Sequence, residues 1–129
     1  MRALLDTSVL LGPPPEEIPG ELAISSASLA ELHFGVLVAR TDAVRAERLR
    51  RLGTIESSFH ALTVDHHVAR HYGRLAAAVA AHGRQPRARV VDLLIAATAV
   101  AHGATLYTRN GADLVGLDGL VTVVDLGGA

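Results

Sequence analysis

The sequence predicts an α/β fold, a three-layer α/β/α sandwich around a central, mainly parallel sheet. Short apolar runs alternate along the chain with amphipathic segments of helical periodicity, the order expected of β–α–β units. The apolar runs are hydrophobic on both faces, as in parallel sheets that helices cover on each side. Because 129 residues is the length of one domain, we expect residues 1–129 to form a single domain.

The first half of the chain contains three predicted strands and two predicted helices. The strands are short apolar runs, of which the third is the weakest: residues 2–5, 22–24 and 61–64. Residues 12–20 hold four of the five prolines and are predicted as a loop. Either Ser26 or Ser28 is expected to cap a helix that runs to about Arg40, and Thr41 to cap the next helix.

The second half contains two further helices and two further strands. Asp65 is expected to cap the clearest helix, whose apolar residues recur at helical spacing and which ends at Gly83. Residues 84–89 are predicted as a basic loop. Residues 90–102 are apolar on nearly every side, so we expect a buried helix that Gly103 ends. Residues 104–108 and 120–124 are predicted as strands, and residues 110–115, which lie between them, as a turn or a short helix.

The composition excludes several classes of protein. The chain has no cysteine, which excludes a disulfide framework, a thiolate zinc site and a cysteine nucleophile. It has 12 arginines but no lysine, which excludes P-loop ATPases, Schiff-base enzymes and lysine-dependent receiver domains. Only four aromatic residues occur, so folds that stack bases on aromatic side chains are disfavoured.

The charges are unevenly distributed although the net charge is only −1. The segment from Arg40 to Arg89 has ten arginines and four acids, a net charge of +6, whereas the rest of the chain has a net charge of −7. The pattern indicates one basic and one acidic surface. The alternative is that arginines simply coat solvated helix faces.

The sequence also bears on location in the cell. It has no apolar run of the roughly 18 to 20 residues that cross a bilayer. The apolar stretch at the N-terminus is interrupted by Asp6 and lacks a small-residue cleavage site, unlike a signal peptide. We therefore expect a cytoplasmic protein with no membrane contact.

Four acids stand at predicted strand ends or near helix starts: Asp6, Glu31, Asp92 and Asp113. Asp92 is the most informative, because it is the only charged residue in the segment 90–101 and an isolated buried carboxylate is costly. Each acid also has an ordinary structural explanation that involves no metal or catalysis. These are a turn cap for Asp6, a capping box with Ser28 for Glu31, the helix dipole for Asp92 and an ordinary turn for Asp113.

Taken together, the four acids predict a metal site. The carboxyl ends of parallel strands meet at one edge of a sheet, where several carboxylates would repel one another. A divalent cation removes that repulsion, and oxygen ligands without cysteine favour Mg²⁺ or Mn²⁺. Such a metal activates water for hydrolysis of a phosphodiester. Three arginines precede Asp92 and could hold nucleic-acid phosphates, unless they are a solvated charge run: Arg84, Arg87 and Arg89.

Four segments resemble PIN-domain nucleases, specifically the small endoribonuclease toxins of the VapC type. Their order and spacing match that family over nearly the whole chain. The segments are Leu-Leu-Asp-Thr-Ser-Val-Leu (4–10), Ser-Leu-Ala-Glu-Leu-His-Phe-Gly (28–35), Val-Asp-Leu-Leu-Ile-Ala-Ala-Thr-Ala (91–99) and Tyr-Thr-Arg-Asn…Asp-Leu (107–114).

The resemblance implies an α/β/α fold in which Asp6, Glu31, Asp92 and Asp113 are catalytic and bind Mg²⁺ or Mn²⁺. It implies that Thr7, Ser8, Thr108 and Asn110 are supporting polar groups, and Arg109 joins the candidates for binding RNA phosphates. The activity implied is cleavage of structured RNA, such as tRNA or rRNA, to 5′-phosphate and 3′-hydroxyl ends. A homodimer and a cognate VapB-type antitoxin, whose tail covers the acids, are also implied. Members often have an aromatic residue where this chain has Leu114.

Other functions remain open at this stage. A PIN nuclease of RNA processing would share these residues, as would a non-catalytic binding module whose acids receive a partner's arginine. A haloacid-dehalogenase-type phosphatase needs an acid where Ser8 stands, and also a lysine. His67 and His71 have zinc-ligand spacing, but no third ligand is evident. A serine hydrolase would need a Gly-x-Ser-x-Gly elbow, which the chain lacks.

Overall fold

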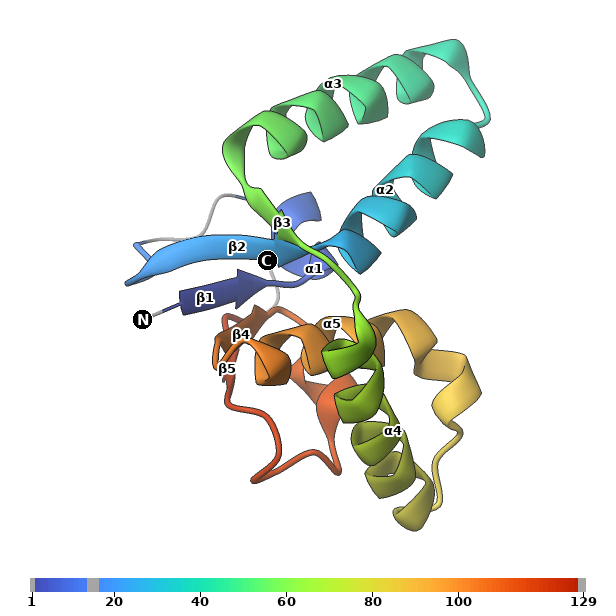
Figure 1. Ribbon diagram of the computed structural model, residues 1–129. Helices are drawn as coiled ribbons and strands as arrows, with labels where there is room; N and C mark the ends of the chain where they lie inside the picture. Colours follow the sequence, from blue (N-terminus) through green and yellow to red (C-terminus); the bar gives the residue numbers. More distant parts are fainter. Residues whose placement is uncertain (1, 14–16, 128–129) are drawn as a thin grey trace.

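The computed structural model describes residues 2–13 and 17–127 and contains an α/β fold (Figure 1). Strands and helices alternate along most of the chain, and two short 3-10 helices, η1 and η2, interrupt the order. In chain order the elements are β1 (Arg2–Leu5), α1 (Thr7–Leu11), β2 (Glu21–Ser25), α2 (Ser26–Leu37), α3 (Asp42–Ser58), β3 (His60–Leu62), α4 (His66–Ala81), η1 (Pro86–Arg89), α5 (Val90–Ala101), β4 (Thr105–Thr108), η2 (Gly111–Leu114) and β5 (Val123–Asp125).

The described part of the chain forms one five-stranded parallel sheet in the order β3-β2-β1-β4-β5. The first strand lies at the centre, where Leu5 pairs with Ile24 of β2 and with Tyr107 of β4. The strand order reverses beside β1, and in open parallel sheets ligands bind outside the carboxyl ends at such a point. The predicted parallel sheet is confirmed.

Helices cover both faces of the sheet (Figure 1). Successive strand side chains point to opposite faces, so Leu4 packs in a core with α4 and α5. Its neighbour Leu5 packs in a second core with α2 and α3. The two cores confirm the predicted three layers. Within residues 2–13 and 17–127, no helix combines the length and hydropathy needed to cross a membrane.

Helix α5 is buried along most of its length, as its sequence predicts. Leu93, Ile95 and Ala96 are at most 1% exposed and belong to the core shared with α4. The helix ends before Gly103, whose φ of +62° is the left-handed conformation that glycine adopts readily. This packing fixes the first turn of α5, which carries Asp92, against the edge of the sheet.

The predicted start of α2 is wrong by one to three residues. Ser25, the last residue of β2, is the cap, and its hydroxyl accepts a hydrogen bond from the amide of Ala27. Ser28 is instead buried inside the helix, so the capping box with Ser28, which was the alternative explanation for Glu31, does not form. The strand passes directly into the helix without a connecting turn, which moves the cap into the strand. The helix also ends at Leu37, short of Arg40.

Several smaller boundaries differ from the prediction. The short helix α1 follows β1 directly, within a stretch that was expected to turn, and η1 lies in the predicted basic loop. β3 covers residues 60–62 rather than 61–64. β5 begins only at Val123, because the amides of Leu120 and Val121 bond to the carbonyl of Leu117 in a turn. Residues 14–16 of the predicted loop 12–20 lie outside the described residues.

Ser25 links two layers of the fold, so its loss is expected to destabilise the protein. Its hydroxyl lies 3.1 Å from the Thr98 hydroxyl of α5, and both side chains are fully buried. Ser25→Ala should lower the free energy of unfolding by about 1–2 kcal/mol, because a cap is lost and Thr98 loses a partner. Urea unfolding measures this. Ser58→Ala, at an exposed helix end, should change it by less than about 0.5 kcal/mol; equal effects would refute the role of Ser25.

Candidate active site

The four predicted acids line one pocket of about 210 Å³ at the carboxyl edge of the sheet. Asp6 follows β1, Glu31 lies in α2, Asp92 in α5 and Asp113 in η2. Thr7, Ser8 and Asn110 line the same pocket. The sheet topology thus places side chains from distant parts of the sequence side by side.

Asp6 is held by the start of α1. Its Oδ1 accepts hydrogen bonds from the amides of Ser8 (2.9 Å) and Val9 (3.4 Å) and from the hydroxyl of Ser8. Asp6 is therefore a helix cap and also lines the acid pocket. All three bonds use Oδ1, so within the described chain Oδ2 remains available to a ligand.

Glu31 is held by Thr7 rather than by its own helix. The Thr7 hydroxyl donates to Glu31 Oε1 over 2.6 Å and also lies 3.1 Å from the buried Ser28 hydroxyl. These contacts tie α1 to α2 at the pocket. In the fold, Thr7 therefore links α1 to the Glu31 carboxylate of α2.

Asp92 is the acid whose ionisation the site disfavours. Burial raises the pKa of its carboxyl above the ordinary value, and the charges of Glu31, Asp113 and Asp6 raise it further. Arg89 acts in the opposite direction. The repulsion among the carboxylates is the feature that a bound cation would relieve.

Asp113 is more exposed than the other acids and is held by an arginine. Arg89 Nη1 lies 3.6 Å from Asp113 Oδ1, and it donates a hydrogen bond to the main-chain carbonyl of Asp113. Arg89 precedes α5, whereas Asp113 lies in η2. The ion pair therefore joins the two segments that carry Asp92 and Asp113.

The carboxylates share a pocket but do not converge on one point. Among residues 2–13 and 17–127, no three histidine, aspartate or glutamate side chains are arranged to hold a metal ion as they stand. Asp6, Glu31 and Asp113 are each turned toward a partner of their own: Ser8, Thr7 and Arg89. The oxygen-only donor set and the repulsion felt by Asp92 nevertheless fit a hard divalent cation.

Ser8, Thr108 and Asn110, which were predicted to be supporting polar groups, take part in a chain of hydrogen bonds behind Asp6. The Ser8 hydroxyl accepts from the amide of Arg109 (2.9 Å) and lies 3.4 Å from the Thr108 hydroxyl. Thr108 is fully buried, and its hydroxyl accepts from the amide of Asn110 over 3.0 Å. The end of β4 is thereby fixed to the start of α1 below the pocket.

The four predicted phosphate-binding arginines occupy different places. The guanidinium of Arg109 donates to the carbonyls of Pro13 (3.0 Å) and Gly127 (3.3 Å), so it fastens loops rather than facing the acids. Arg84 and Arg87 are not among the residues that line the acid pocket. Only Arg89 contacts one of the four acids within the described residues.

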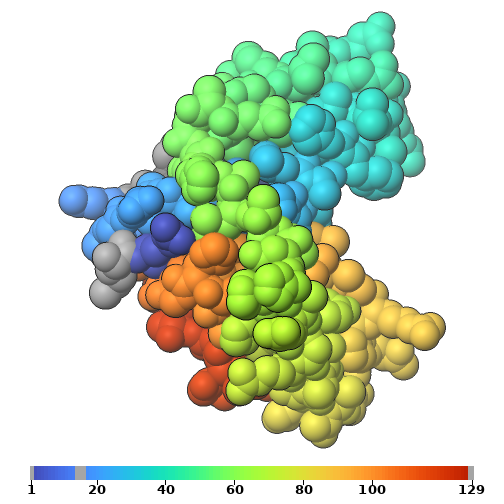
Figure 2. Space-filling model, viewed as in Figure 1, coloured from blue at the N-terminus to red at the C-terminus, as the bar shows by residue number. Residues whose placement is uncertain are grey.

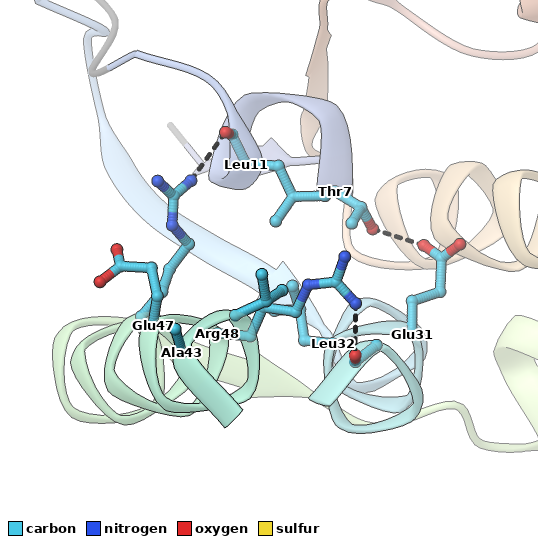
Figure 3. A pocket seen from close by; sticks show the side chains of 10 residues that line it. Thr7, Leu11, Glu31, Leu32, Ala43, Glu47 and Arg48 are labelled. Atoms are coloured by element: carbon cyan, nitrogen blue, oxygen red, sulfur yellow. Dashed lines mark hydrogen bonds between the residues drawn. The ribbon is translucent and has the colours of Figure 1, made fainter. Parts of the chain in front are cut away.

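A larger groove of about 710 Å³ adjoins the acid pocket and was missed at the sequence level (Figure 3). It lies between α1, α2 and α3 and shares Thr7, Leu11 and Glu31 with the acid pocket. Its basic residues, Arg48 and Arg51, each donate over 2.7 Å to the end of a neighbouring helix, at Gly35 and Leu11. The sequence feature that could have indicated this groove is the three-residue spacing of Arg48 and Arg51, which places both on one face of α3.

The groove is largely apolar and open to solvent. Leu11 is 53% exposed and Val44 is 40% exposed, although both line it. Figure 3 shows Thr7 and Glu31 pointing toward each other at one end of the groove. In Figure 2 the α2–α3 hairpin stands apart from the α4–η1 segment, with an indented surface between them. The acid pocket thus adjoins an open groove that has exposed apolar side chains.

Asp92 gives the metal-free protein a defined pH dependence. Its raised pKa means that the folded state binds this proton more tightly than the unfolded state does, so the stabilising contribution is full below the ordinary value of 3.8. It is lost as the pH rises through the raised pKa. With chelator at pH 7, Asp92→Asn should therefore raise the melting temperature, and the gain should shrink as the pH is lowered toward 4.

Asp65→Asn is a control that should change the melting temperature in the opposite direction, because the pKa of Asp65 is lowered rather than raised. Hydrogen bonds from the amides of Val68 and His67 lower the pKa of this exposed helix cap. Its contribution is present at neutral pH and is lost in acid, so Asp65→Asn should lower the melting temperature at pH 7. If Asp92→Asn also lowered it, the carboxylate repulsion inferred at the pocket would be refuted.

Comparison with known proteins identifies relatives over almost the whole chain. A family model described as PIN domain matches residues 3–115. Ribonuclease VapC5 of Mycobacterium tuberculosis is 38% identical over 126 residues, which cover 93% of this chain and 90% of that protein. Ribonuclease VapC4 of the same organism is 35% identical over 115 residues, 84% of this chain and 86% of that protein.

Solved structures that resemble this chain over nearly its whole length include proteins of the same kind. The crystal structure of VapBC-5 from Mycobacterium tuberculosis, a member of the VapBC family of toxin-antitoxin systems, matches with a TM-score of 0.83 and 36% identity, covering 98% of each chain. FitAcB from Neisseria gonorrhoeae matches with a TM-score of 0.77 and 28% identity, again covering 98% of each chain. The chain belongs to the PIN-domain family and, within it, to the VapC proteins.

Proposed function

We propose that this protein is a Mg²⁺- or Mn²⁺-dependent endoribonuclease that cleaves structured RNA, such as tRNA or rRNA, as the toxin of a toxin–antitoxin pair. The observation that carries the proposal is the gathering of Asp6, Glu31, Asp92 and Asp113 around one pocket. The two curated relatives are both named ribonucleases, which supports RNA as the substrate. A metal-free role as an arginine receptor would leave the repulsion at Asp92 uncompensated in the free protein.

The four carboxylates are the residues that would hold the ion. When bound, it would supply an activated water and would neutralise charge that develops on a phosphoryl oxygen. Thr7 would keep Glu31 directed at the pocket, and Ser8 would keep Asp6 oriented by occupying Oδ1. Asp92, on the rigid α5, would provide the fixed point of the site because its helix is packed on the sheet.

The partner we infer is a VapB-type antitoxin that covers the acids. A matched solved structure at 36% identity is described as a member of the VapBC family of toxin–antitoxin systems. The groove beside the acid pocket has exposed apolar side chains, Leu11 and Val44, which fit a peptide segment with apolar residues. A basic side chain on that segment could enter the pocket and pair with the carboxylates. We further infer one domain, a homodimer and a cytoplasmic location.

Cleavage of purified cellular RNA tests the proposal. Protein freed of any partner should produce discrete fragments with Mn²⁺ or Mg²⁺ and none with chelator. The fragments should accept ligation that requires a 5′-phosphate, because attack of water on phosphorus with the 3′ oxygen as the leaving group gives 5′-phosphate and 3′-hydroxyl ends. Fragments that form equally well in chelator would contradict metal dependence.

RNA cleavage by the complex with the antitoxin tests whether that partner covers the acids. The antitoxin encoded beside the gene should form a complex that no longer cleaves RNA. A complex that retains full activity would refute coverage of the acids. Absence of cleavage by folded, partner-free protein, against RNA from its own cell, would favour the non-catalytic binding module.

A further inference from the structure

Arg89 stands apart from the other basic residues near the acid pocket. It ends η1 immediately before α5, and its guanidinium reaches across to η2. There it donates to the main-chain carbonyl of Asp113 and lies 3.6 Å from the Asp113 carboxylate. The Arg89 side chain is only 24% exposed, compared with 50% for Asp113. A guanidinium that is partly removed from water beside a carboxylate is more than a solvated surface charge.

The charges around Arg89 give it a second role besides its hydrogen bond. It lies one helical turn before Asp92, and its positive charge favours the ionised form of that carboxyl. Three of the four pocket acids do the opposite at Asp92. Within residues 2–13 and 17–127, Arg89 is the arginine that forms an ion pair with a pocket acid. Arg109 is directed at main-chain carbonyls elsewhere.

We propose that Arg89 is an internal counterion of the acid pocket, which holds Asp113 in the metal-free protein and competes with a divalent cation for that carboxylate. Binding of the cation would require Asp113 to turn from the guanidinium toward the other acids, and the nearby positive charge would oppose a second one. Arg89 is thus a positioning residue that sets metal affinity. The competition rests on the proposed metal site, whereas the counterion role does not.

A purely structural role predicts the opposite effect on metal binding. If Arg89 served only to fasten η2 to α5, its removal would loosen Asp113 and weaken the metal site. If it is a counterion, its removal deletes a competing charge and strengthens the site. The sign of the change in metal affinity therefore distinguishes the two roles.

Calorimetric titration with Mn²⁺ at low ionic strength measures that sign. Arg89→Gln should lower the Kd by about tenfold, the order expected for removing one charge from beside a divalent ion. Arg89→Lys keeps the charge and should stay within about twofold of wild type. Arg87→Gln is the matched control, an exposed arginine of the same short helix, and should also stay within about twofold. An unchanged or raised Kd in Arg89→Gln would overturn the competition.

A cycle in metal-free protein tests the counterion role without any metal. With chelator present, Arg89→Gln should lower the melting temperature by a few degrees in the wild type. The loss should be smaller in an Asp113→Asn background, since the carboxylate that Arg89 pairs with is then uncharged. Equal losses in both backgrounds would overturn the counterion role.

The two experiments separate failure of this inference from failure of the proposed function. Wild-type protein that binds no Mn²⁺ would refute the metal site and the competition together, and the cycle would still decide the counterion role. If the wild-type protein binds Mn²⁺ but Arg89→Gln has no effect in either experiment, only the role inferred for Arg89 would be refuted.

Discussion

Asp92→Asn is expected to reduce RNA cleavage about a thousandfold while leaving the fold intact. Asparagine has nearly the same shape but lacks the charge that would hold the metal, and metal stabilisation of the transition state is worth several kcal/mol. The helix that carries residue 92 should be unaffected, because its core contacts come from Leu93, Ile95 and Ala96. Single-turnover cleavage with Mn²⁺ gives the rate, and circular dichroism confirms the fold.

Asp118→Asn is the matched control for this loss. Asp118 is an exposed acid beyond η2 that lines a different pocket from the four acids. Its loss makes the same change in net charge, so cleavage should stay within about twofold of the wild-type rate. If Asp92→Asn cleaved RNA as fast as Asp118→Asn, the assignment of the active site would be wrong.

Mn²⁺ should raise the melting temperature of the wild-type protein by about 8–10 °C when it is present at 100 times its Kd. A ligand at that excess stabilises the state it binds by about 2.7 kcal/mol, and a chain of this length gains a few degrees for each kcal/mol. The repulsion at Asp92 is relieved by the same event. Differential scanning calorimetry with Mn²⁺ and with chelator measures the shift.

The size of this shift should depend on the acids and not on the protein surface. Asp92→Asn should reduce the shift to about 2 °C or less, because the binding energy of one carboxylate is lost. Asp118→Asn should keep it in full. A shift of equal size in all three proteins would mean that Mn²⁺ binds elsewhere.

The sheet and its long helices could be predicted because their sequence signals are local and strong. The apolar run at residues 2–5 and the unbroken apolar segment around Asp92 each specify one element. Because parallel strands present their carboxyl ends at one edge, the order of elements was enough to place Asp6 and Asp92 at the same pocket. The gathering of the four acids therefore followed from topology.

The details of the site depend on contacts between distant residues, which periodicity does not encode. Ser28 looked like a cap, but the direct passage of β2 into α2 gave that role to Ser25. Thr7 holds Glu31 only because α1 lies beside α2. Arg109 looked like a phosphate ligand, yet the fold brings two carbonyls to its guanidinium. The groove beside α3 could not be predicted, because its walls also include residues of α1 and α2.

Crystals of the protein grown with Mn²⁺ would test the central claim most directly, through the anomalous scattering of manganese. The expected result is a strong anomalous peak between Asp6, Glu31, Asp92 and Asp113, with carboxylate oxygens at about 2.0–2.3 Å from it. The Asp113 side chain should have turned from Arg89 toward the peak, whereas Glu31 should keep its hydrogen bond from Thr7. A manganese peak elsewhere, or none at a concentration that supports RNA cleavage, would contradict the metal site on which the proposed function rests.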